Sequence, residues 1–447
     1  MDIIETTEKA IEETERIHKK LNCFITICVK EAKARAKELK MSKKKGRLFG
    51  KFISVKDAIC TRGIRTTAGS AILANYVPPF NATVIDKIEA EGGIVIGKTT
   101  MDDFGFGTFC TNVGKGLPVP KNPHDIGRAT GGSSGGAGAA TFEFSKDHLA
   151  LAESTGGSIT APAAFCGVVG VTPTYGKVSR YGLIDYANSL DKIGTMGKNV
   201  SEAEMLSRVI FGKDKQDETS WTQEEKPAKK IKKIGVIKEM LNGVDEKIKK
   251  AFWNAINKLG AEYEEISFPL IDYSVASYYI IATAEASSNL ARYYGMRYGA
   301  QEDISGSFSE HFASIRSKYF SDEEKRRIIL GTFVRTAGYK DKYYLKALRI
   351  REKIKQEFAL LFKRFDSLVT PAMPIIAPKF DEITKLKPIE VYALDSCTIP
   401  PNLAGLPHLS IPMSKVNNMP VGLQIICNSW EENMLFEFGR QVESVLK

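Results

Sequence analysis

The sequence predicts an α/β fold, with one large domain over residues 1–447 in which helices flank a mixed, mostly parallel β-sheet. Strand-like and helix-like segments alternate along the chain, which is the pattern of a sheet covered by helices. A chain of 447 residues with 43% apolar content can bury a core of that size. The strand pattern resumes after a charged stretch at about 213–232, which is therefore predicted to be a surface connection; a domain linker is the alternative.

The individual elements follow in chain order. An opening amphipathic helix is predicted from spaced apolar residues, Ile4, Ile11, Ile17 and Leu21. Phe52–Val55 is predicted to be a strand that ends at Lys56. A helix over Thr83–Ala90, capped by Thr83, leads through two glycines into a strand at Ile94–Ile96. Later strands are expected at Leu149–Ala152, Ile234–Ile237, Ser367–Thr370, His408–Ile411 and Val421–Ile426.

Composition argues against several classes of protein. The longest apolar runs fall well short of the roughly 18 residues that a membrane span needs. Met1–Ala10 is acidic and polar where a secretory signal would be basic and then apolar, so we expect a cytoplasmic protein with no membrane partner. The histidines, at 18, 124, 148, 311 and 408, do not cluster at metal-ligand spacing, so no metal is expected at the reaction centre.

The cysteines and the net charge each have an ordinary explanation. Seven cysteines without a C-x-x-C pair, most of them in apolar runs, are predicted to be buried free thiols; a cysteine nucleophile is the alternative. The net charge of +10 is spread through runs such as Lys43–Arg47 and Lys226–Lys233 without aromatic interleaving. A solvated, lysine-rich surface is expected, with a weak attraction for an acidic partner such as tRNA as the alternative.

Two glycine-serine clusters are the most informative motifs: Gly131–Gly136 (GGSSGG) and Thr155–Ser158 (TGGS). The first cluster is not a phosphate-binding loop, because that motif needs a lysine before its serine or threonine. It is not the dinucleotide fingerprint either, since its glycines are adjacent and the nearest predicted strand lies downstream. A flexible turn would explain one cluster alone, but two clusters that each contain a serine favour a chemical role.

An amide hydrolase needs a nucleophile, a base and donors for an oxyanion, and these motifs with one lysine supply all three. Ser158 is the candidate nucleophile. Glycine tolerates the φ values of a backbone nest, so the preceding N–H groups are the candidate oxyanion donors: Thr155, Gly156 and Gly157. No histidine accompanies them. Lys56, whose burial at a strand end would favour the neutral amine, is therefore the candidate base, with Ser133 as a hydroxyl relay.

These residues resemble the amidase signature family, whose centre is a Ser-cisSer-Lys triad. The matching stretches are Ile53–Asp57, Gly131–Gly136, Thr155–Ile159, Pro162–Ala163 and Gly167–Thr174. The resemblance implies the amidase signature fold over the whole chain. It also implies that Ser158 is the nucleophile, that Ser133 is a bridging serine after a cis peptide bond, and that Lys56 is the base.

Further stretches resemble the branch of that family whose members belong to tRNA-dependent amidotransferases: Tyr175–Leu183, Ser189–Asp191, Ala284–Arg292, Lys325–Phe333 and Pro401–Pro407. This implies a subunit that hydrolyses glutamine to glutamate and ammonia, and that supplies the ammonia for misacylated Glu-tRNA(Gln) and/or Asp-tRNA(Asn). The implied partners in a heterotrimer are a B subunit, which would bind the tRNA and use ATP with Mg²⁺, and a small C subunit. No cofactor is expected in this chain.

The resemblance also implies how glutamine is held. Arg327 would bind its α-carboxylate, Asp395 its α-ammonium, and Tyr278 would line the pocket, since selecting glutamine over a plain amide needs a fixed cation and a fixed anion. The alternatives are that Arg327 and Asp395 are ordinary surface charges and that Tyr278 belongs to the core. Two rival functions remain: a stand-alone amidase acting on small or aryl amides, and a catalytically silent scaffold protein.

The chain departs from the family pattern beside its candidate nucleophile. Ser154 and Thr160 stand where aspartate and arginine are usual in the family, and Lys192 and Thr195 where glutamine and proline are usual. We hypothesise that the usual aspartate and arginine pair across the turn, so that losing both leaves no unpaired buried charge. The other two departures concern the partner contacts and the floor of the substrate pocket.

Overall fold

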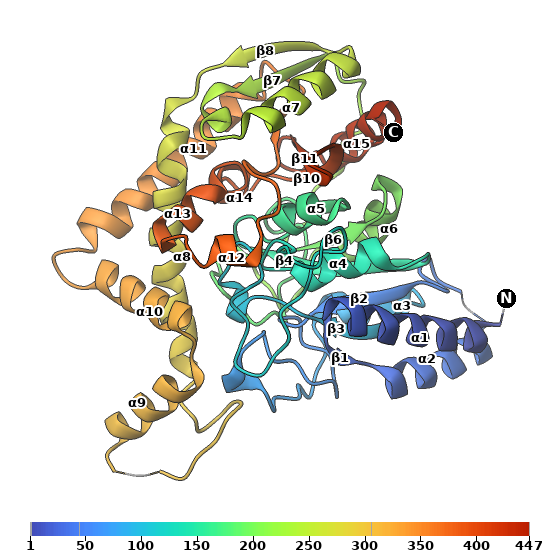
Figure 1. Ribbon diagram of the computed structural model, residues 1–447, viewed down its shortest axis with the longest axis vertical. Coiled ribbons are helices and arrows are strands. Elements are labelled where there is room, and N and C mark those ends of the chain that lie inside the picture. The colour runs from blue at the N-terminus through green and yellow to red at the C-terminus, as the bar shows by residue number, and fades with distance from the viewer. Residues whose placement is uncertain (1, 44, 305, 447) are drawn as a thin grey trace.

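The computed structural model describes residues 2–43, 45–304 and 306–446. Its centre is an eleven-stranded sheet in the order β1-β3-β2-β4-β6-β5-β10-β11-β9-β7-β8. Helices cover both faces of this sheet (Figure 1). The predicted α/β architecture with a large mixed sheet flanked by helices is therefore confirmed.

The strands include every strand that the sequence predicts, most of them longer than predicted. They are β1 (Phe24–Ile27), β2 (Phe52–Lys56), β3 (Ile94–Thr99), β4 (His148–Ser154), β5 (Val169–Thr172), β6 (Lys192–Gly197), β7 (Lys233–Ile237), β8 (Glu262–Ile266), β9 (Ser367–Pro371), β10 (His408–Val416) and β11 (Met419–Ile426). The sequence pattern does not predict β1, β5, β6 or β8. In β8 the residues are mostly polar and exposed, so no apolar run marks it.

The sheet is less parallel than expected: the strands form four parallel and six antiparallel pairs among the described residues. The parallel pairs lie toward the two ends of the sheet, and β4 to β9 run antiparallel through its middle. One cause is the hairpin of β10 and β11. Asn417 and Asn418, at φ 50° and 62°, form its two-residue turn, which is the conformation that joins adjacent antiparallel strands.

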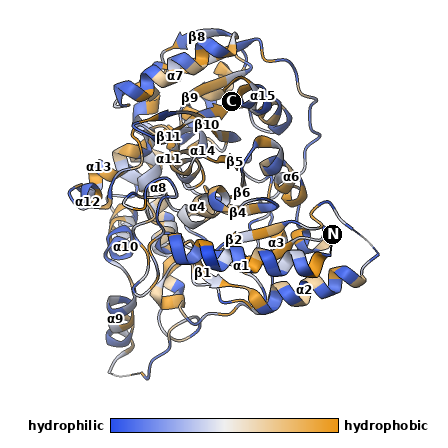
Figure 2. Cartoon of the chain, turned by 45° about the vertical axis from the view of Figure 1, so that its right-hand side comes forward, coloured by the Kyte–Doolittle hydropathy of each residue, from blue (hydrophilic) through white to orange (hydrophobic). Residues whose placement is uncertain are grey.

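The longer helices begin with α1 (Ile3–Leu21), α2 (Val29–Met41), α3 (Thr83–Ala90), α4 (Gly135–Glu143), α5 (Thr160–Cys166), α6 (Val200–Ile210) and α7 (Glu246–Leu259). They continue with α8 (Ser274–Asn289), α9 (Phe308–Tyr319), α10 (Asp322–Arg335), α11 (Lys346–Leu361) and α15 (Glu432–Leu446). Short helices are α12 (Phe380–Ile383), α13 (Pro388–Ala393) and α14 (Ile399–Leu403). In α1 the buried side is mostly apolar and the charged residues are mostly exposed, and Figure 2 shows both kinds of residue along this helix.

Two predictions about helices, one about the opening helix and one about a helix cap, have different outcomes. The opening helix is confirmed as α1; Ile11, Ile17 and Leu21 are buried, whereas Ile4 is only partly buried. The predicted cap at Thr83 is wrong. The N-cap position of α3 is Ala82, which makes no side-chain hydrogen bond, and Thr83 instead donates its hydroxyl to Asp214.

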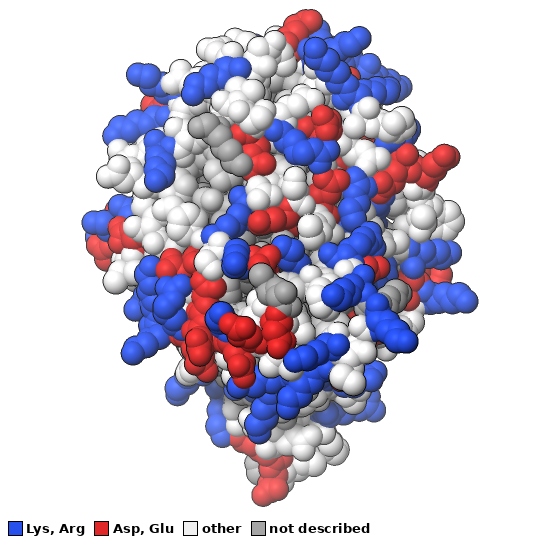
Figure 3. Space-filling model, turned by 90° about the vertical axis from the view of Figure 1, so that its right-hand side faces the viewer, with Lys and Arg blue, Asp and Glu red and all other residues white. Residues whose placement is uncertain are grey.

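The surface and the cysteines agree with the compositional expectations. The connection between α6 and β7 contains no helix or strand over 213–232 and is mostly exposed, and β7 then joins the same sheet beside β9. Figure 3 shows lysine and arginine side chains interspersed with acidic ones over one face. All seven cysteines are buried and free, as predicted. None of the helices in the described ranges has the length and apolar character of a membrane span.

Candidate active site

The candidate site lies where two neighbouring strands end. β2 ends at Lys56, and β4 ends at Ser154, immediately before Thr155. These strands pair in parallel, so their carboxyl ends meet at one edge of the sheet. Ser133 lies just before α4, which packs on β4 and β2. The topology therefore brings together three segments that are far apart in the sequence.

Lys56 is fully buried, and its Nζ atom has three hydrogen-bond partners. Nζ lies 2.7 Å from Ser133 Oγ, 3.0 Å from the backbone carbonyl oxygen of Glu153 and 2.8 Å from Glu153 Oε2. The structure thus brings Lys56 and Ser133 together as predicted. The pairing with Glu153 was not predicted, although an acidic residue directly after the apolar run Leu149–Ala152 was a usable signal.

Ser133 follows a cis peptide bond from Gly132, as the resemblance implies. The site also contains an aspartate that was not predicted from the sequence. Asp102 accepts hydrogen bonds from the backbone N–H groups of Cys110 (3.0 Å) and Asn112 (2.9 Å), and it packs so closely on Gly132 that a Cβ there would collide with its carboxyl group. The loop after β3 and the GGSSGG segment therefore form one packed unit.

Ser158 retains a small exposed fraction of 6%. Its carbonyl oxygen accepts a hydrogen bond of 3.2 Å from the N–H group of Ser134, which fastens its segment to that of Ser133. Within the described parts of the chain its hydroxyl has no hydrogen-bond partner. The hydroxyl is therefore available to a substrate, and its role as nucleophile stays a prediction.

The two glycines before the candidate nucleophile are needed for a different reason from the one predicted. Neither Gly156 nor Gly157 has a positive φ. A Cβ on Gly156 would lie 2.9 Å from the hydroxyl oxygen of Tyr278, and one on Gly157 would collide with Thr398, so close packing requires glycine here. The N–H groups of residues 155–158 make no hydrogen bond to any described residue, which leaves them available to an oxyanion.

The carboxyl group of Asp191 also belongs to this centre, and the sequence did not predict it. Thr155 Oγ1 is 2.9 Å from Glu153 Oε1 and 2.8 Å from Asp191 Oδ1. One hydroxyl hydrogen serves only one of these contacts, so the other needs a proton on a carboxyl group. Burial, reinforced by the charge of Glu153, raises the pKa of Asp191 well above its usual range. The direction of this shift favours the proton on Asp191 rather than on Glu153.

Arg327 on α10 is a buried cation, 3% exposed, so it is not an ordinary surface charge. Its Nη1 donates to Tyr186 Oη at 2.6 Å and its Nε to Glu323 Oε1 at 2.8 Å. Nη2 has no hydrogen-bond partner in the described ranges. The guanidinium lies 4.9–5.5 Å from the centres of four aromatic rings, those of Phe106, Tyr186, Tyr279 and Tyr392.

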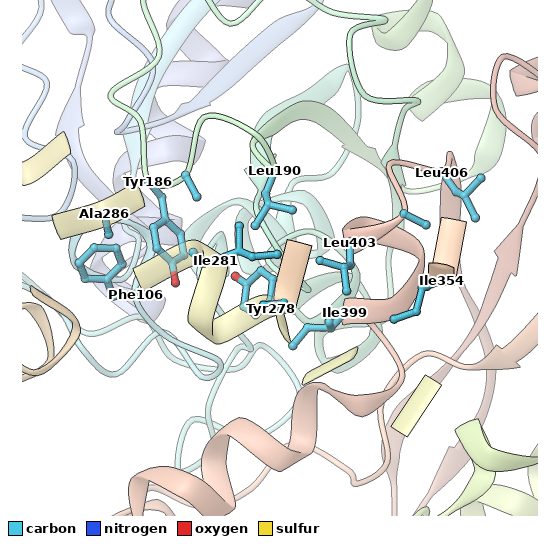
Figure 4. Packing of buried hydrophobic residues seen from close by; sticks show 14 of the residues in the cluster. Phe106, Tyr186, Leu190, Tyr278, Ile281, Ala286, Ile354, Ile399, Leu403 and Leu406 are labelled. Atoms are coloured by element: carbon cyan, nitrogen blue, oxygen red, sulfur yellow. The ribbon is translucent and has the colours of Figure 1, made fainter. Parts of the chain in front are cut away.

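Asp395 is also buried, and Tyr279 links it to Arg327. Asp395 Oδ2 accepts hydrogen bonds from Tyr279 Oη at 2.7 Å and from Thr108 Oγ1 at 3.2 Å. Oδ1 has no partner among the described residues. Burial raises the pKa of Asp395 to about 6. Tyr278 lies in the main apolar cluster together with Tyr186 and Phe106, as Figure 4 shows, and its hydroxyl approaches Gly156.

A cavity of about 260 Å³ opens at these residues. Its lining includes Asp102, Phe106, Thr108, Arg327 and Tyr392. Thr108 bonds to Asp395, and Asp102 packs on the glycine before Ser133. Arg327 therefore lines the cavity directly, whereas Asp395 and Gly132 each contact a residue of its wall. Its size and mixed lining suit a small polar molecule.

The residues that depart from the family pattern are all buried: Ser154, Thr160, Lys192 and Thr195. The Ser154 hydroxyl donates to a nearby backbone carbonyl group, whereas Thr160 Oγ1 has no partner among the described residues. Lys192 also donates to a carbonyl group, and burial lowers its pKa well below its usual range. The Thr195 hydroxyl donates to a carbonyl group of α6 at 2.9 Å, so this departure concerns the contact between β6 and α6.

A buried lysine bonded to a cis-linked serine, next to a serine whose neighbouring N–H groups are free, is the arrangement of an amide hydrolase that works with serine and lysine. In the described ranges, His, Cys, Asp and Glu side chains form no group of three that could hold a metal ion. The Amidase family model matches residues 5–436, and the chain belongs to that family.

Named relatives cover almost the whole chain. It is 45% identical over 436 residues to the A subunit of glutamyl-tRNA(Gln) amidotransferase from Archaeoglobus fulgidus, which covers 96% of this chain and 94% of that protein. It is 42% identical over 453 residues to the protein of the same name from Sulfurisphaera tokodaii, covering 100% and 95%. The crystal structure of the A subunit of glutamyl-tRNA(Gln) amidotransferase from Thermotoga maritima matches with a TM-score of 0.82 and 35% identity, covering 99% of this chain and 91% of that one.

The buried positions of Ser154 and Thr160 allow the pairing hypothesis to be tested by stability. Ser154→Asp alone should place a carboxylate in the interior without the usual arginine, opposite Lys192 in the β4–β6 pair, and lower the free energy of unfolding by up to about 3–5 kcal/mol. The double variant with Thr160→Arg should recover much of that loss. Thermal unfolding of the two variants and of the unchanged protein measures the difference; equal unfolding temperatures for the two variants would show that the side chains do not pair.

Proposed function

We propose that this chain is a glutaminase subunit that hydrolyses glutamine to glutamate and ammonia, and that the ammonia converts misacylated Glu-tRNA(Gln) and/or Asp-tRNA(Asn). One observation carries the choice of glutamine. Arg327 lines the cavity, and Asp395, of opposite charge, is bonded to Thr108 in the same lining; each keeps a polar atom, Nη2 or Oδ1, without a partner among the described residues. Glutamine presents an α-carboxylate and an α-ammonium that complement these two atoms.

The proposed chemistry is acyl transfer through Ser158. Neutral Lys56 takes a proton from Ser133, Ser133 takes one from Ser158, and Ser158 attacks the side-chain carbonyl carbon of glutamine. The free N–H groups of residues 155–158 stabilise the oxyanion, each donor contributing about 2.7–4 kcal/mol of transition-state stabilisation. Ammonia leaves with a proton returned from the relay, and water then hydrolyses the glutamyl ester on Ser158.

The proposed partners supply the rest of the reaction. The names of the relatives support a place in a complex that acts on glutamyl-tRNA(Gln). We assign tRNA binding and ATP with Mg²⁺ to a B subunit, with a small C subunit completing a heterotrimer, and we assign no cofactor to this chain. We also propose that the enzyme acts in the cytoplasm.

Ammonia release from glutamine tests this function. The chain should release ammonia when it is assembled with the B and C subunits, and Ser158→Ala should reduce that rate by at least about 10³-fold because the nucleophile is lost. Ser145→Ala, which alters an exposed serine outside the site, is the matched control and should change nothing. The assay is run for the chain alone and for the complex, with and without misacylated tRNA.

The same assay separates the rival functions. A stand-alone amidase would turn over small or aryl amides without partners and would tolerate Arg327→Ala or Asp395→Asn. A silent scaffold would release no ammonia under any condition. Glutamine hydrolysis that survives Ser158→Ala would contradict the proposed mechanism.

The affinity for glutamine should depend on pH through Asp395. Only the ionised carboxylate attracts the α-ammonium, and burial raises the pKa of Asp395 to about 6, so the ionised fraction falls as the pH drops through that value. KM should therefore stay constant between about pH 7 and 8 and rise by up to tenfold for each unit below about pH 6. Asp395→Asn should raise KM throughout and remove this dependence. A KM that stays flat down to pH 5 would contradict the assignment.

A further inference from the structure

Glu153 uses both of its carboxyl oxygens inside the site. Oε2 is 2.8 Å from Lys56 Nζ, and Oε1 is 2.9 Å from Thr155 Oγ1, which in turn is 2.8 Å from Asp191 Oδ1. The side chains of Lys56 and Glu153 are 0% and 4% exposed. A continuous row of hydrogen bonds therefore runs from Asp191 through Thr155, Glu153 and Lys56 to Ser133.

This row bears on a requirement of the proposed mechanism. Lys56 removes a proton from Ser133 only when Nζ is neutral and has a free lone pair. A carboxylate at 2.8 Å favours the ammonium form instead, and the three N–H bonds of an ammonium match the three acceptors around Nζ. In that form Nζ donates to Ser133 and accepts nothing, so the lysine is not yet a base.

We propose that Glu153 is a positioning residue that takes a proton from Lys56 within the buried pair, so that Lys56 becomes the neutral base without releasing a proton to solvent. One N–H bond of Nζ breaks and one O–H bond forms at Glu153 Oε2. The ion pair becomes a neutral amine and a neutral acid, and the net charge of the pair stays zero. The lone pair then accepts the proton of Ser133. This inference rests on the proposed amide hydrolysis through Ser158.

The surroundings of the pair favour this exchange. Two buried charges lose the stabilisation that water gives them, whereas a neutral amine and a neutral acid do not carry that cost. An ionised Lys56–Glu153 pair and a neutral one have the same net charge of zero, and burial raises the pKa of the neighbouring Asp191 well above its usual range, which favours its neutral form. Moving one proton by a single hydrogen bond therefore changes no net charge in the interior.

Other titratable groups, on the loop after β3, interact electrostatically with Lys56. Asp102 and Cys110 both interact electrostatically with Lys56. Burial raises the pKa of Asp102 to about 7 and the pKa of Cys110 well above its usual range. Arg327 on α10 acts on Asp102 in turn. A substitution at Glu153 leaves Asp102, Cys110 and Arg327 in place, but it also removes the charge that helps to raise the pKa of Asp191, so the comparison between variants reports on Glu153 together with Asp191.

The test compares the pH dependence of kcat for the unchanged protein and for Glu153→Gln, in the assembled complex at saturating glutamine. At saturating glutamine the titration of Asp395 does not affect the measured rate, because it acts on glutamine binding. In the variant, Lys56 must lose its proton to solvent. The acidic limb, which is the pH below which kcat declines, should therefore move up by at least about one pH unit. Below it, kcat should fall about tenfold per pH unit. The rate should recover at high pH.

The sign of the shift distinguishes the alternatives. If Glu153 only stabilises the ammonium, removing its charge makes Lys56 easier to deprotonate, and the limb moves down in pH. If Glu153 is merely structural, the rate falls equally at every pH. Either result would overturn the proposal. Glu153→Asp, which keeps a carboxyl group, should hold the limb near its original position.

A matched control and a measurement without variants complete the test. Glu432→Gln removes another buried glutamate that faces a lysine, Lys177 at 3.6 Å, and should leave the limb unmoved. Should Glu153→Gln not fold, the unchanged protein decides: the proposal expects its limb well below the ordinary pKa of lysine, about 10.4, and a limb near that value would overturn it. If the unchanged protein releases no ammonia at any pH, the proposed function has failed instead.

Discussion

The burial of Lys56 is the constraint on which the rest of the site depends. An amine in the protein interior costs several kcal/mol unless other groups replace its water. The parallel pairing of β2 with β4 supplies two of those groups, both from Glu153, and the segment after the cis peptide bond supplies the third, the hydroxyl of Ser133. A hydrogen bond from Ser134 to the carbonyl group of Ser158 then joins the segment of the candidate nucleophile to this centre.

The same requirement organises the substrate side of the cavity. Arg327 and Asp395 are buried charges, and aromatic side chains surround the arginine while Tyr279 bridges toward the aspartate. Protein partners satisfy only part of the hydrogen-bonding capacity of these two charges. Arg327 is bonded to Glu323 and Tyr186, and Asp395 is bonded to Thr108 and Tyr279. In the proposed function the remaining atoms bind a ligand that carries both charges, and a free amino acid has that property. An amide without an α-carboxylate and an α-ammonium would leave both groups unpaired.

The sequence was most predictive where a residue's chemistry is unusual for its position. Lys56 at the end of an apolar strand, and serines beside glycines, were enough to select the residues of the candidate centre, of which Lys56 and Ser133 are in contact, and all the strands predicted from apolar runs were found. The antiparallel centre of the sheet was not predicted, because strand patterns carry no information on direction. Glu153, Asp102 and Asp191 were missed, since their roles depend on which backbone and side chains fold against them. The glycines before Ser158 were located correctly but explained by φ, whereas close packing requires them.

Trapping the acyl-enzyme is the decisive experiment for the serine-lysine centre. The assembled complex would be incubated with glutamine, quenched in acid and digested, and the peptides would be examined by mass spectrometry. The expected product is a glutamyl ester on Ser158 with Ser133 unmodified, because Ser133 only relays a proton. A glutamyl group on Ser133 or on a cysteine, or ammonia release without any covalent intermediate in quenched samples taken during turnover, would contradict the proposed mechanism.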